Sequence, residues 1–331
     1  MRPLFHPTLI NGRFGDPALS IETLFESRLV MFDLGDISAL SARKIQRITH
    51  VFVSHAHIDH FVGFDQLLRL LIGREKTLHL YGPAGFAAHV HHKLHGYQWN
   101  LVDFYRSDLV LVVDELDAGA VRTTRFRFKT AFAAEPMDAK PITDGKLLEE
   151  PMFEVSAAIL EHRTPCLGFA LQERAHLNVW KTRLIERGLP IGPWLADLKR
   201  AVAQNRADDH LIRVGAARTS HGRPIPLGEL RDVLTITPGQ KIAYITDVSD
   251  TPANRAAIVA LARNADVLFI EAAFAREDTA LAVERAHLTT AAAGEIARAA
   301  EVRHVEPFHF SPRYAGEESR MLAEVAAAFD G

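Results

Sequence analysis

The sequence feature that most constrains this chain is the stretch His55-Ala56-His57-Ile58-Asp59-His60, which has the pattern H-x-H-x-D-H. It follows an apolar run at residues 48–53, whose composition predicts a buried strand. Apolar residues at helical spacing then predict an amphipathic helix over residues 61–71. The polar side chains of the motif therefore lie in the turn between a strand and a helix.

The residue types in this turn indicate a metal site. In an extended turn, residues two apart point to the same side, so His55 and His57 can bind one metal ion. Asp59 and His60 follow where the helix begins and point elsewhere, toward a second ion. Imidazole and carboxylate ligands suit zinc and also iron or manganese, so the sequence leaves the identity of the metal open.

Length and composition are those of an ordinary soluble protein. The chain has 331 residues, 48% of them hydrophobic and 24% charged, and its net charge of −3 creates no strong overall field for nucleic acid. Its single cysteine, Cys166, excludes an intrachain disulfide and is compatible with a reducing compartment. Residues 1–7 lack an apolar signal core, and no run is long enough to span a membrane. We therefore expect a cytoplasmic protein without membrane contact.

The motif and its position resemble the metallo-β-lactamase superfamily, whose metal-binding signature is H-x-H-x-D-H after a strand. Strands alternate with helices in both halves of the chain, which suggests two sheets packed face to face with helices outside. Predicted strands include residues 126–132, 153–160, 241–245, 267–270 and 302–305. We expect an α/β fold, an αβ/βα four-layer sandwich of the metallo-β-lactamase type, as a single domain over residues 1–331.

Three more residues that can bind a metal each follow a predicted strand: His162, Asp247 and His309. Side chains at the same edge of a sheet can converge on one cavity. The predicted ligand sets are His55, His57 and His162 for one ion, and Asp59, His60 and His309 for the other. Asp247 would bridge the ions with its two oxygens, which leaves positions open for a shared water, as a catalytic site requires.

The later motifs resemble one branch of the superfamily, the ribonuclease Z family of tRNA 3′-processing endonucleases. They are His162 followed by Gly168-Phe169, then Asp266-Val267-Leu268-Phe269-Ile270-Glu271-Ala272-Ala273-Phe274, His287-Leu288-Thr289-Thr290 and His309-Phe310-Ser311-Pro312-Arg313-Tyr314. The resemblance runs from about residue 48 to residue 316.

This resemblance implies a phosphodiesterase with two zinc ions, in which an activated water attacks phosphorus. Asp59 would orient that water, and His287 would protonate the leaving 3′ oxygen as general acid. Glu271 would hold His287 in the required tautomer. Ser311 and Arg313 would bind the phosphate, the arginine through a charge-assisted fork. The resemblance also implies a tRNA precursor as substrate and a homodimer.

An insertion at residues 173–231 differs from the rest of the chain. It contains 11 Lys/Arg and 6 Asp/Glu, a net charge of +5 on an otherwise acidic protein. Its segment 188–193, which ends in Gly192-Pro193, resembles the Gly-Pro motif of the arm with which ribonuclease Z holds tRNA. A basic arm suits phosphate contact, and the alternative is a solvated surface insertion. Trp180 and Trp194 fit stacking on bases and packing of a small core equally well.

Two other functions stay open, because the chain departs from the family at Ile58, where glycine is usual, and at Thr246-Asp247-Val248, where G-D-T is usual. One is a hydrolase of a small phosphodiester, a cyclic nucleotide or a lactone. Deletion of the insertion would then spare the small ester. The other is a metal-binding or nucleic-acid-binding protein without catalysis, which the loss of turnover in Asp59→Ala would exclude.

Overall fold

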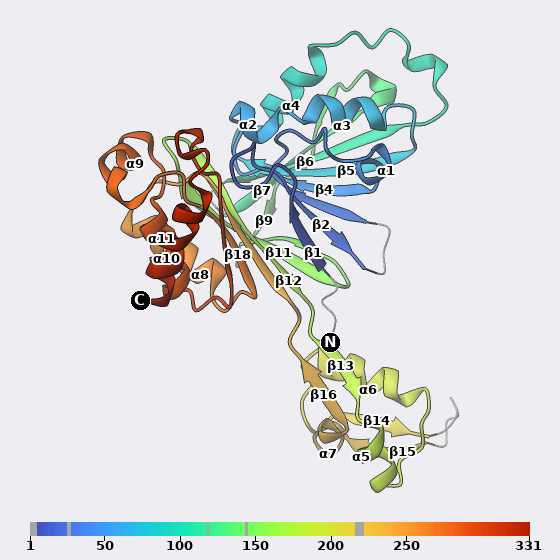
Figure 1. Cartoon of the computed structure of the whole chain (residues 1–331). Coiled ribbons are helices and arrows are strands. Elements are labelled where there is room, and N and C mark those ends of the chain that lie inside the picture. Colours follow the sequence, from blue (N-terminus) through green and yellow to red (C-terminus); the bar gives the residue numbers. More distant parts are fainter. Residues whose placement is uncertain (1–4, 25–27, 118, 143–144, 216–221) are drawn as a thin grey trace. The chain divides into compact units, whose positions relative to one another are not determined.

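The computed structural model describes residues 5–331 apart from 25–27, 118, 143–144 and 216–221. The chain forms two compact units (Figure 1). Unit 1 consists of Met1–Gln172 and Gln240–Gly331, and unit 2 consists of Glu173–Gly239. Among the described residues, no helix combines the length and apolarity that crossing a bilayer requires.

Unit 1 contains two mixed sheets. The strands of the first are β1 (Phe5–Leu9), β2 (Leu19–Thr23), β3 (Leu29–Phe32), β4 (Ile48–Phe52), β5 (Lys76–Pro83), β6 (Leu109–Asp117), β7 (Ala120–Arg127), β8 (Ala134–Pro136) and β9 (Lys140–Pro141). They lie in the order β1 to β8, and β9 pairs with β7. The strands of the second, in spatial order, are β10 (Lys146–Glu149), β11 (Phe153–Glu161), β12 (Pro165–Glu173), β17 (Lys241–Ile245), β18 (Val267–Glu271) and β19 (Val305–Phe308).

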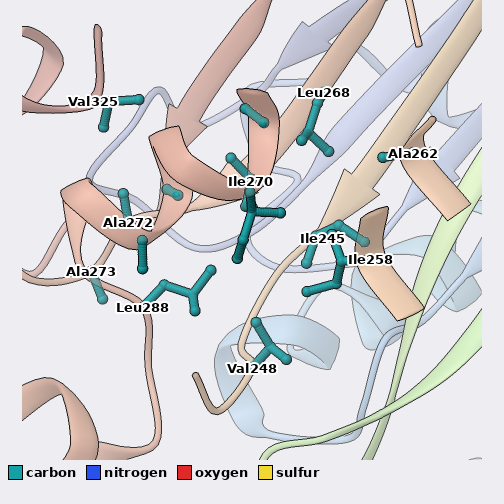
Figure 2. Packing of buried hydrophobic residues seen from close by; sticks show 14 of the residues in the cluster. Ile245, Val248, Ile258, Ala262, Leu268, Ile270, Ala272, Ala273, Leu288 and Val325 are labelled. Atoms are coloured by element: carbon teal, nitrogen blue, oxygen red, sulfur yellow. The ribbon is translucent and has the colours of Figure 1, made fainter. Parts of the chain in front are cut away.

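Helices cover the outer faces of both sheets (Figure 1). Beside the first sheet lie α1 (Ala42–Gln46), α2 (Ile58–Phe61), α3 (Phe64–Leu71) and α4 (Phe86–His95), and beside the second lie α8 (Pro252–Ala262), α9 (Thr279–Arg285), α10 (Thr290–Ala299) and α11 (Glu318–Asp330). Figure 2 shows part of the buried cluster between the second sheet and its helices.

The period-two alternation of the strands explains why the layers form. In β17, Ile242 and Tyr244 face the first sheet, whereas Ala243 and Ile245 face the helices. All four side chains are buried, so this strand is apolar on both faces, as a strand inside a covered sheet must be. The predicted αβ/βα four-layer sandwich is thereby confirmed.

Three local predictions are wrong. The expected helix over 61–71 is two helices, because Gly63 N donates to the carbonyl oxygen of Leu34 at 2.9 Å and not to the preceding helical turn. The strand expected at 126–132 is β7, which ends at Arg127, since Ala131 and Phe132 have positive φ in the turn that follows. The strand expected at 302–305 begins at Val305, the residue that pairs with Leu268.

Unit 2 has its own small core. It contains β13 (His176–Val179), α5 (Lys181–Glu186), α6 (Trp194–Ala203), β14 (Leu211–Val214), β15 (Arg223–Pro226), α7 (Leu227–Leu230) and β16 (Leu234–Thr237). β13 pairs with β16 and β14 pairs with β15, both antiparallel. Trp194 is buried in the core of this unit, whereas Trp180 is 47% exposed and carries the Arg183 guanidinium over its ring at 4.2 Å.

Candidate metal-dependent active site

The residues predicted as metal ligands come together at the carboxyl ends of strands in both sheets of unit 1. The motif follows β4, His162 follows β11, Asp247 follows β17, and His309 follows β19. β17, β18 and β19 are mutually parallel, so their carboxyl ends meet at one edge. Donor atoms of His55, His57, His162 and Asp247 lie within 4.8 Å of one another, and so do those of Asp59, His60 and His309.

Asp247 lies between these two groups and turns one oxygen to each. Its Oδ2 is 3.8 Å from His55 Nε2 and 3.5 Å from His162 Nε2. Its Oδ1 is 3.4 Å from His60 Nε2 and 3.0 Å from His309 Nδ1. This arrangement has the geometry of a carboxylate that can bridge two cations.

Two buried nitrogen atoms in the second group, which consists of Asp59, His60 and His309, indicate whether a cation fits there. His60 Nε2 and His309 Nδ1 have no hydrogen-bond partner among the described residues. A buried polar atom without a partner is costly and calls for an explanation, such as an ion. Both atoms face carboxylate oxygen, and Asp59 Oδ2 lies 3.5 Å from His60 Nε2 and 3.5 Å from His309 Nε2. The donor set therefore fits divalent metal ions.

The charges of the site agree with this reading. Burial lowers the pKa of His55 to about 2, and the neighbouring His60 adds to the effect, so the His55 imidazole is neutral, as a metal ligand must be. Burial raises the pKa of Asp247, but His309 and His60 outweigh it and hold that pKa well below its usual value. Burial likewise lowers the pKa of His309, but Asp247 and Asp59 raise it to about 10. The space between His309 and the carboxylates of Asp247 and Asp59 thus favours a positive charge, which a proton or a metal ion can supply.

Asp33, which sequence reasoning missed, orients the second group. Its carboxylate is fully buried and accepts hydrogen bonds from His60 Nδ1 at 2.9 Å, from the Tyr244 hydroxyl at 2.9 Å and from Ser54 N at 2.6 Å. Because Nδ1 of His60 donates to Asp33, its Nε2 presents a lone pair to the site. The sequence signal for it is an aspartate directly after the apolar run at residues 29–32.

The first group is oriented from a different part of the chain. His162 Nδ1 donates to the carbonyl oxygen of Ala286 at 2.7 Å, which leaves its Nε2 free for a metal. Ala286 ends α9 in a left-handed conformation with φ of 62°. The same turn carries His287, so one helix end positions both a predicted ligand and the predicted general acid.

His287 and Glu271 are paired. His287 Nδ1 lies 3.2 Å and 3.1 Å from the two oxygens of Glu271, whose Oε1 also accepts from Val248 N at 2.7 Å. Burial lowers the pKa of His287, but the Glu271 carboxylate more than offsets this, and the net direction is upward. A donor atom of His287 also lies within 4.8 Å of Asp247 and His309, so this residue is closer to the ligands than the sequence indicated.

A cavity of about 550 Å³ opens onto Asp59, His287 and His309. Ser311 and Arg313, predicted to bind phosphate, also line it. The remaining lining residues are Phe14, Gly15, Asp16, Ala273, Phe274, Leu281, Arg285, Phe310 and Pro312. Of these, Arg285 is a cation that sequence reasoning overlooked, because nothing in its local pattern marks it.

Gly192 and Pro193 lie in unit 2, at the start of α6. Their carbonyl oxygens accept from Leu195 N at 3.2 Å and Ala196 N at 3.0 Å, and Trp194 Nε1 donates to the Pro190 carbonyl at 2.8 Å. This turn is therefore ordered by its own hydrogen bonds within unit 2.

Known proteins resemble this chain over most of its length. Residues 32–178 and 197–310 match the family profile of the beta-lactamase superfamily domain. A ribonuclease Z from Deinococcus radiodurans is 31% identical over 294 residues, which cover 88% of this chain and 84% of that protein. A ribonuclease BN from Cronobacter sakazakii is 30% identical over 287 residues, 86% of this chain and 78% of that protein.

Solved structures share the fold at lower identity. The crystal structure of the short form of human tRNase Z superposes with a TM-score of 0.53 at 18% identity, covering 94% of this chain and 92% of that one. A metallo-beta-lactamase fold protein from Bacillus subtilis gives a TM-score of 0.55 at 13% identity, covering 98% and 95%.

Proposed function

Because this chain belongs to the ribonuclease Z family within the metallo-β-lactamase superfamily, we propose that it is a metal-dependent endoribonuclease that removes the 3′ trailer of tRNA precursors. The observation that best supports this chemistry is the position of Asp247, whose two carboxylate oxygens face two separate groups of residues that can bind metal.

We propose that two zinc ions occupy the site, although iron and manganese accept the same ligands. One would be held by His55, His57 and His162, the other by Asp59, His60 and His309, with Asp247 between them. When bound, such ions supply Lewis acidity and make water acidic enough to ionise near neutral pH. Two orienting contacts support these sets, because His60 and His162 each use their Nδ1 in a hydrogen bond within the protein.

Proton transfer would be the work of two side chains. Burial raises the pKa of Asp59, but the neighbouring His309 and His60 outweigh burial and hold that pKa below its usual value. The Asp59 carboxylate that lines the cavity is therefore ionised, which is the form that can orient water and accept its proton. His287 donates through Nδ1 to Glu271, which leaves Nε2 to deliver a proton to the leaving 3′ oxygen. Glu271 acts through His287 and not on the substrate.

The phosphate would be bound by Ser311 and Arg313 at the cavity wall. Arg313 is held by Asp278, whose Oδ2 is 3.6 Å from Arg313 Nη1 and also accepts from the Tyr314 hydroxyl. A braced guanidinium loses little freedom when it binds a phosphate, which supports this role.

Unit 2 would bind the tRNA body. Residues 173–231 carry a net charge of +5, and exposed Trp180 with Arg183 on its ring offers a surface for stacking or phosphate contact. Gly192 and Pro193 would take part as the family motif does. We also propose a cytoplasmic homodimer, on family resemblance alone.

A metal analysis combined with cleavage of an unmodified tRNA precursor tests the proposal. We expect two metal ions per chain and a single cut at the 3′ end of the acceptor stem, and we expect Asp59→Ala to lose the cleavage while circular dichroism shows that the fold is retained. Cleavage of a small phosphodiester but not of the precursor would refute the tRNA substrate. Unchanged precursor cleavage by Asp59→Ala would remove that residue from the mechanism.

A further inference from the structure

Some of the residues that line the active-site cavity have no part in the proposed phosphate hydrolysis. Asp59, His287, His309, Ser311 and Arg313 account for metal binding, proton transfer and phosphate binding, and Arg285 adds a further cation. The cavity is also lined by aromatic and apolar residues together with one carboxylate: Phe14, Asp16, Ala273, Phe274, Leu281 and Phe310. A phosphate group has nothing to gain from these side chains.

Phe14 is a partly exposed ring with a firm support. Phe310, which is buried, meets it edge to face, with ring centroids 5.4 Å apart and planes at 72°. Such an arrangement stabilises the pair beyond the area it buries. The result is an aromatic ring at the cavity wall that cannot easily turn away when a flat ligand approaches.

The loop that carries Phe14 is fixed on both sides of the site. Arg13 donates to Glu306 at 2.6 Å and to the carbonyl of Pro307, and its own carbonyl accepts from Phe310 N at 2.8 Å. Asn11 Nδ2 donates to the carbonyls of Asp16 and Asp36, each at 2.8 Å. These bonds join the loop to the segment that carries His309 and to the segment that carries Asp33, so the wall is ordered before substrate binds.

Asp16 is the second unusual feature of this wall. Its carboxylate has no hydrogen-bond or ion-pair partner among the described residues, yet it lines the cavity. An ionised carboxylate only accepts hydrogen bonds, and it repels a phosphate. On a nucleotide, whose hydrogen-bond donors are neutral, its partner would be a sugar hydroxyl or an exocyclic amine.

We propose that this wall is a nucleoside-binding subsite, in which a base next to the scissile phosphate stacks on Phe14 and a donor of that nucleoside bonds to Asp16. The inference rests on the proposed function for the scissile phosphate but concerns a different part of the cavity. A cavity of about 550 Å³ has room for one nucleotide. Stacking tolerates any base, so the subsite selects nucleotides over other phosphates and not one sequence over another.

The test compares adenosine 5′-monophosphate with methyl phosphate as ligands of the metal-loaded protein, by calorimetry. Both present a phosphate, and only the first presents a nucleoside. We expect the wild type to bind the nucleotide at least about tenfold more tightly, Phe14→Leu to lose most of this preference, and Phe14→Tyr to keep it. Phe104→Leu is the matched control, because Phe104 is 83% exposed and lies outside the cavity.

Asp16→Ala provides a readout that a structural defect would not give. Loss of the acceptor should weaken nucleotide binding, whereas loss of the negative charge should strengthen methyl phosphate binding. 2′-Deoxyadenosine 5′-monophosphate, in the same series, shows whether the bonded donor is the 2′-hydroxyl.

Equal affinity of the wild type for the two ligands, or the same preference in Phe14→Leu and Phe104→Leu, would overturn the subsite. Turnover of methyl p-nitrophenyl phosphate by the same preparation tests the proposed function separately. A protein that binds the nucleotide selectively through Phe14 but hydrolyses no diester would contradict the function and leave the subsite standing.

Discussion

The two units of this protein organise their polar residues in opposite ways. In unit 1, three residues at the centre of the site are deeply buried, with His55, His60 and Asp247 each at most 3% exposed. In unit 2, the core is apolar and the distinctive side chains lie outside, with Trp180 47%, Ile191 65% and Ile185 75% exposed. Chemistry at a single atom needs donors fixed in place, whereas contact with a charged polymer needs accessible charge and surface.

The charges of unit 2 are only partly available for such contact. Arg187 pairs with Asp232 at 2.5 Å, and Arg231 pairs with Asp208 at 2.6 Å. By contrast, Lys181 and Arg213 have no acidic partner among the described residues. If unit 2 binds RNA, these unpaired cations are the ones that should matter.

The largest effect should come from removing the carboxylate between the two ligand groups. Asp247→Ala is expected to lose bound metal and all measurable turnover, on both a tRNA precursor and a small diester, because each group loses one of its oxygens. Mass spectrometry measures the bound metal, and single-turnover assays measure the activity. The control is Asp250→Ala, an aspartate paired with Arg255; full metal content in Asp247→Ala would show that Asp247 is not a ligand.

A smaller effect, confined to unit 1, should distinguish proton transfer from metal binding. His287→Gln is expected to slow precursor cleavage by about 10²–10⁴-fold, because the leaving 3′ oxygen needs a proton. A p-nitrophenyl diester has a leaving group that needs none, so its hydrolysis should fall far less. Equal losses on both substrates, or loss of metal, would assign His287 to the ligand set instead.

Excision of unit 2 tests the comparison directly. Gln172 and Lys241 are paired neighbours on antiparallel strands, so a two-residue Asn-Gly turn can join them. The shortened protein should keep its metal and its activity on a small diester, and lose about 10²-fold or more in kcat/KM on the precursor, since binding at two places becomes binding at one. Normal precursor cleavage would leave unit 2 without a part in tRNA binding.

Asp33 should have an effect of intermediate size. Asp33→Asn keeps the shape of the side chain but removes the charge that orients His60, and should lower metal affinity by about 10–100-fold. Chelator competition measures this, with Asp36→Asn as control, because Asp36 is exposed and, among the described residues, its carboxylate bonds only to Ser38. Unaltered affinity would mean that Tyr244 and Ser54, not His60, explain the buried charge.

The smallest effect concerns the unpaired cations of unit 2. The double variant Lys181→Ala/Arg213→Ala should reduce the salt dependence of precursor binding, by a slope of about one for each lost phosphate contact. Lys44→Ala/Lys93→Ala removes the same charge from unit 1, where both side chains are already paired, at 2.6 Å with Glu22 and 2.8 Å with Asp65. Identical slopes for the two variants would place the phosphate contacts elsewhere.

Sequence reasoning reached the parts of the site that are encoded locally. The H-x-H-x-D-H turn, and the positions of His162, Asp247 and His309 after strands, follow from periodicity and residue type within a few residues. The insertion was visible from its charge. The break between α2 and α3 was not, because it depends on the hydrogen bond from Gly63 N to the distant Leu34 carbonyl.

The orienting contacts that the sequence did not reveal share one property, which is that the two partners are distant in the chain. Asp33 lies 27 residues from His60 and 211 from Tyr244, and His162 lies 124 from the carbonyl of Ala286. No local pattern encodes such pairs, because they arise only when strands and helices from distant parts of the chain meet in the folded protein.

The sequence by itself thus determined the ligand types, the strand ends that carry them and the family. Tertiary structure alone decided which oxygen of Asp247 faces which group, which nitrogen of each histidine stays free, and that Phe14 and Asp16 stand at the cavity. The physical reason is that side-chain chemistry and backbone periodicity are properties of neighbours in the chain, whereas orientation is set by hydrogen bonds and packing between segments that meet only in the folded protein.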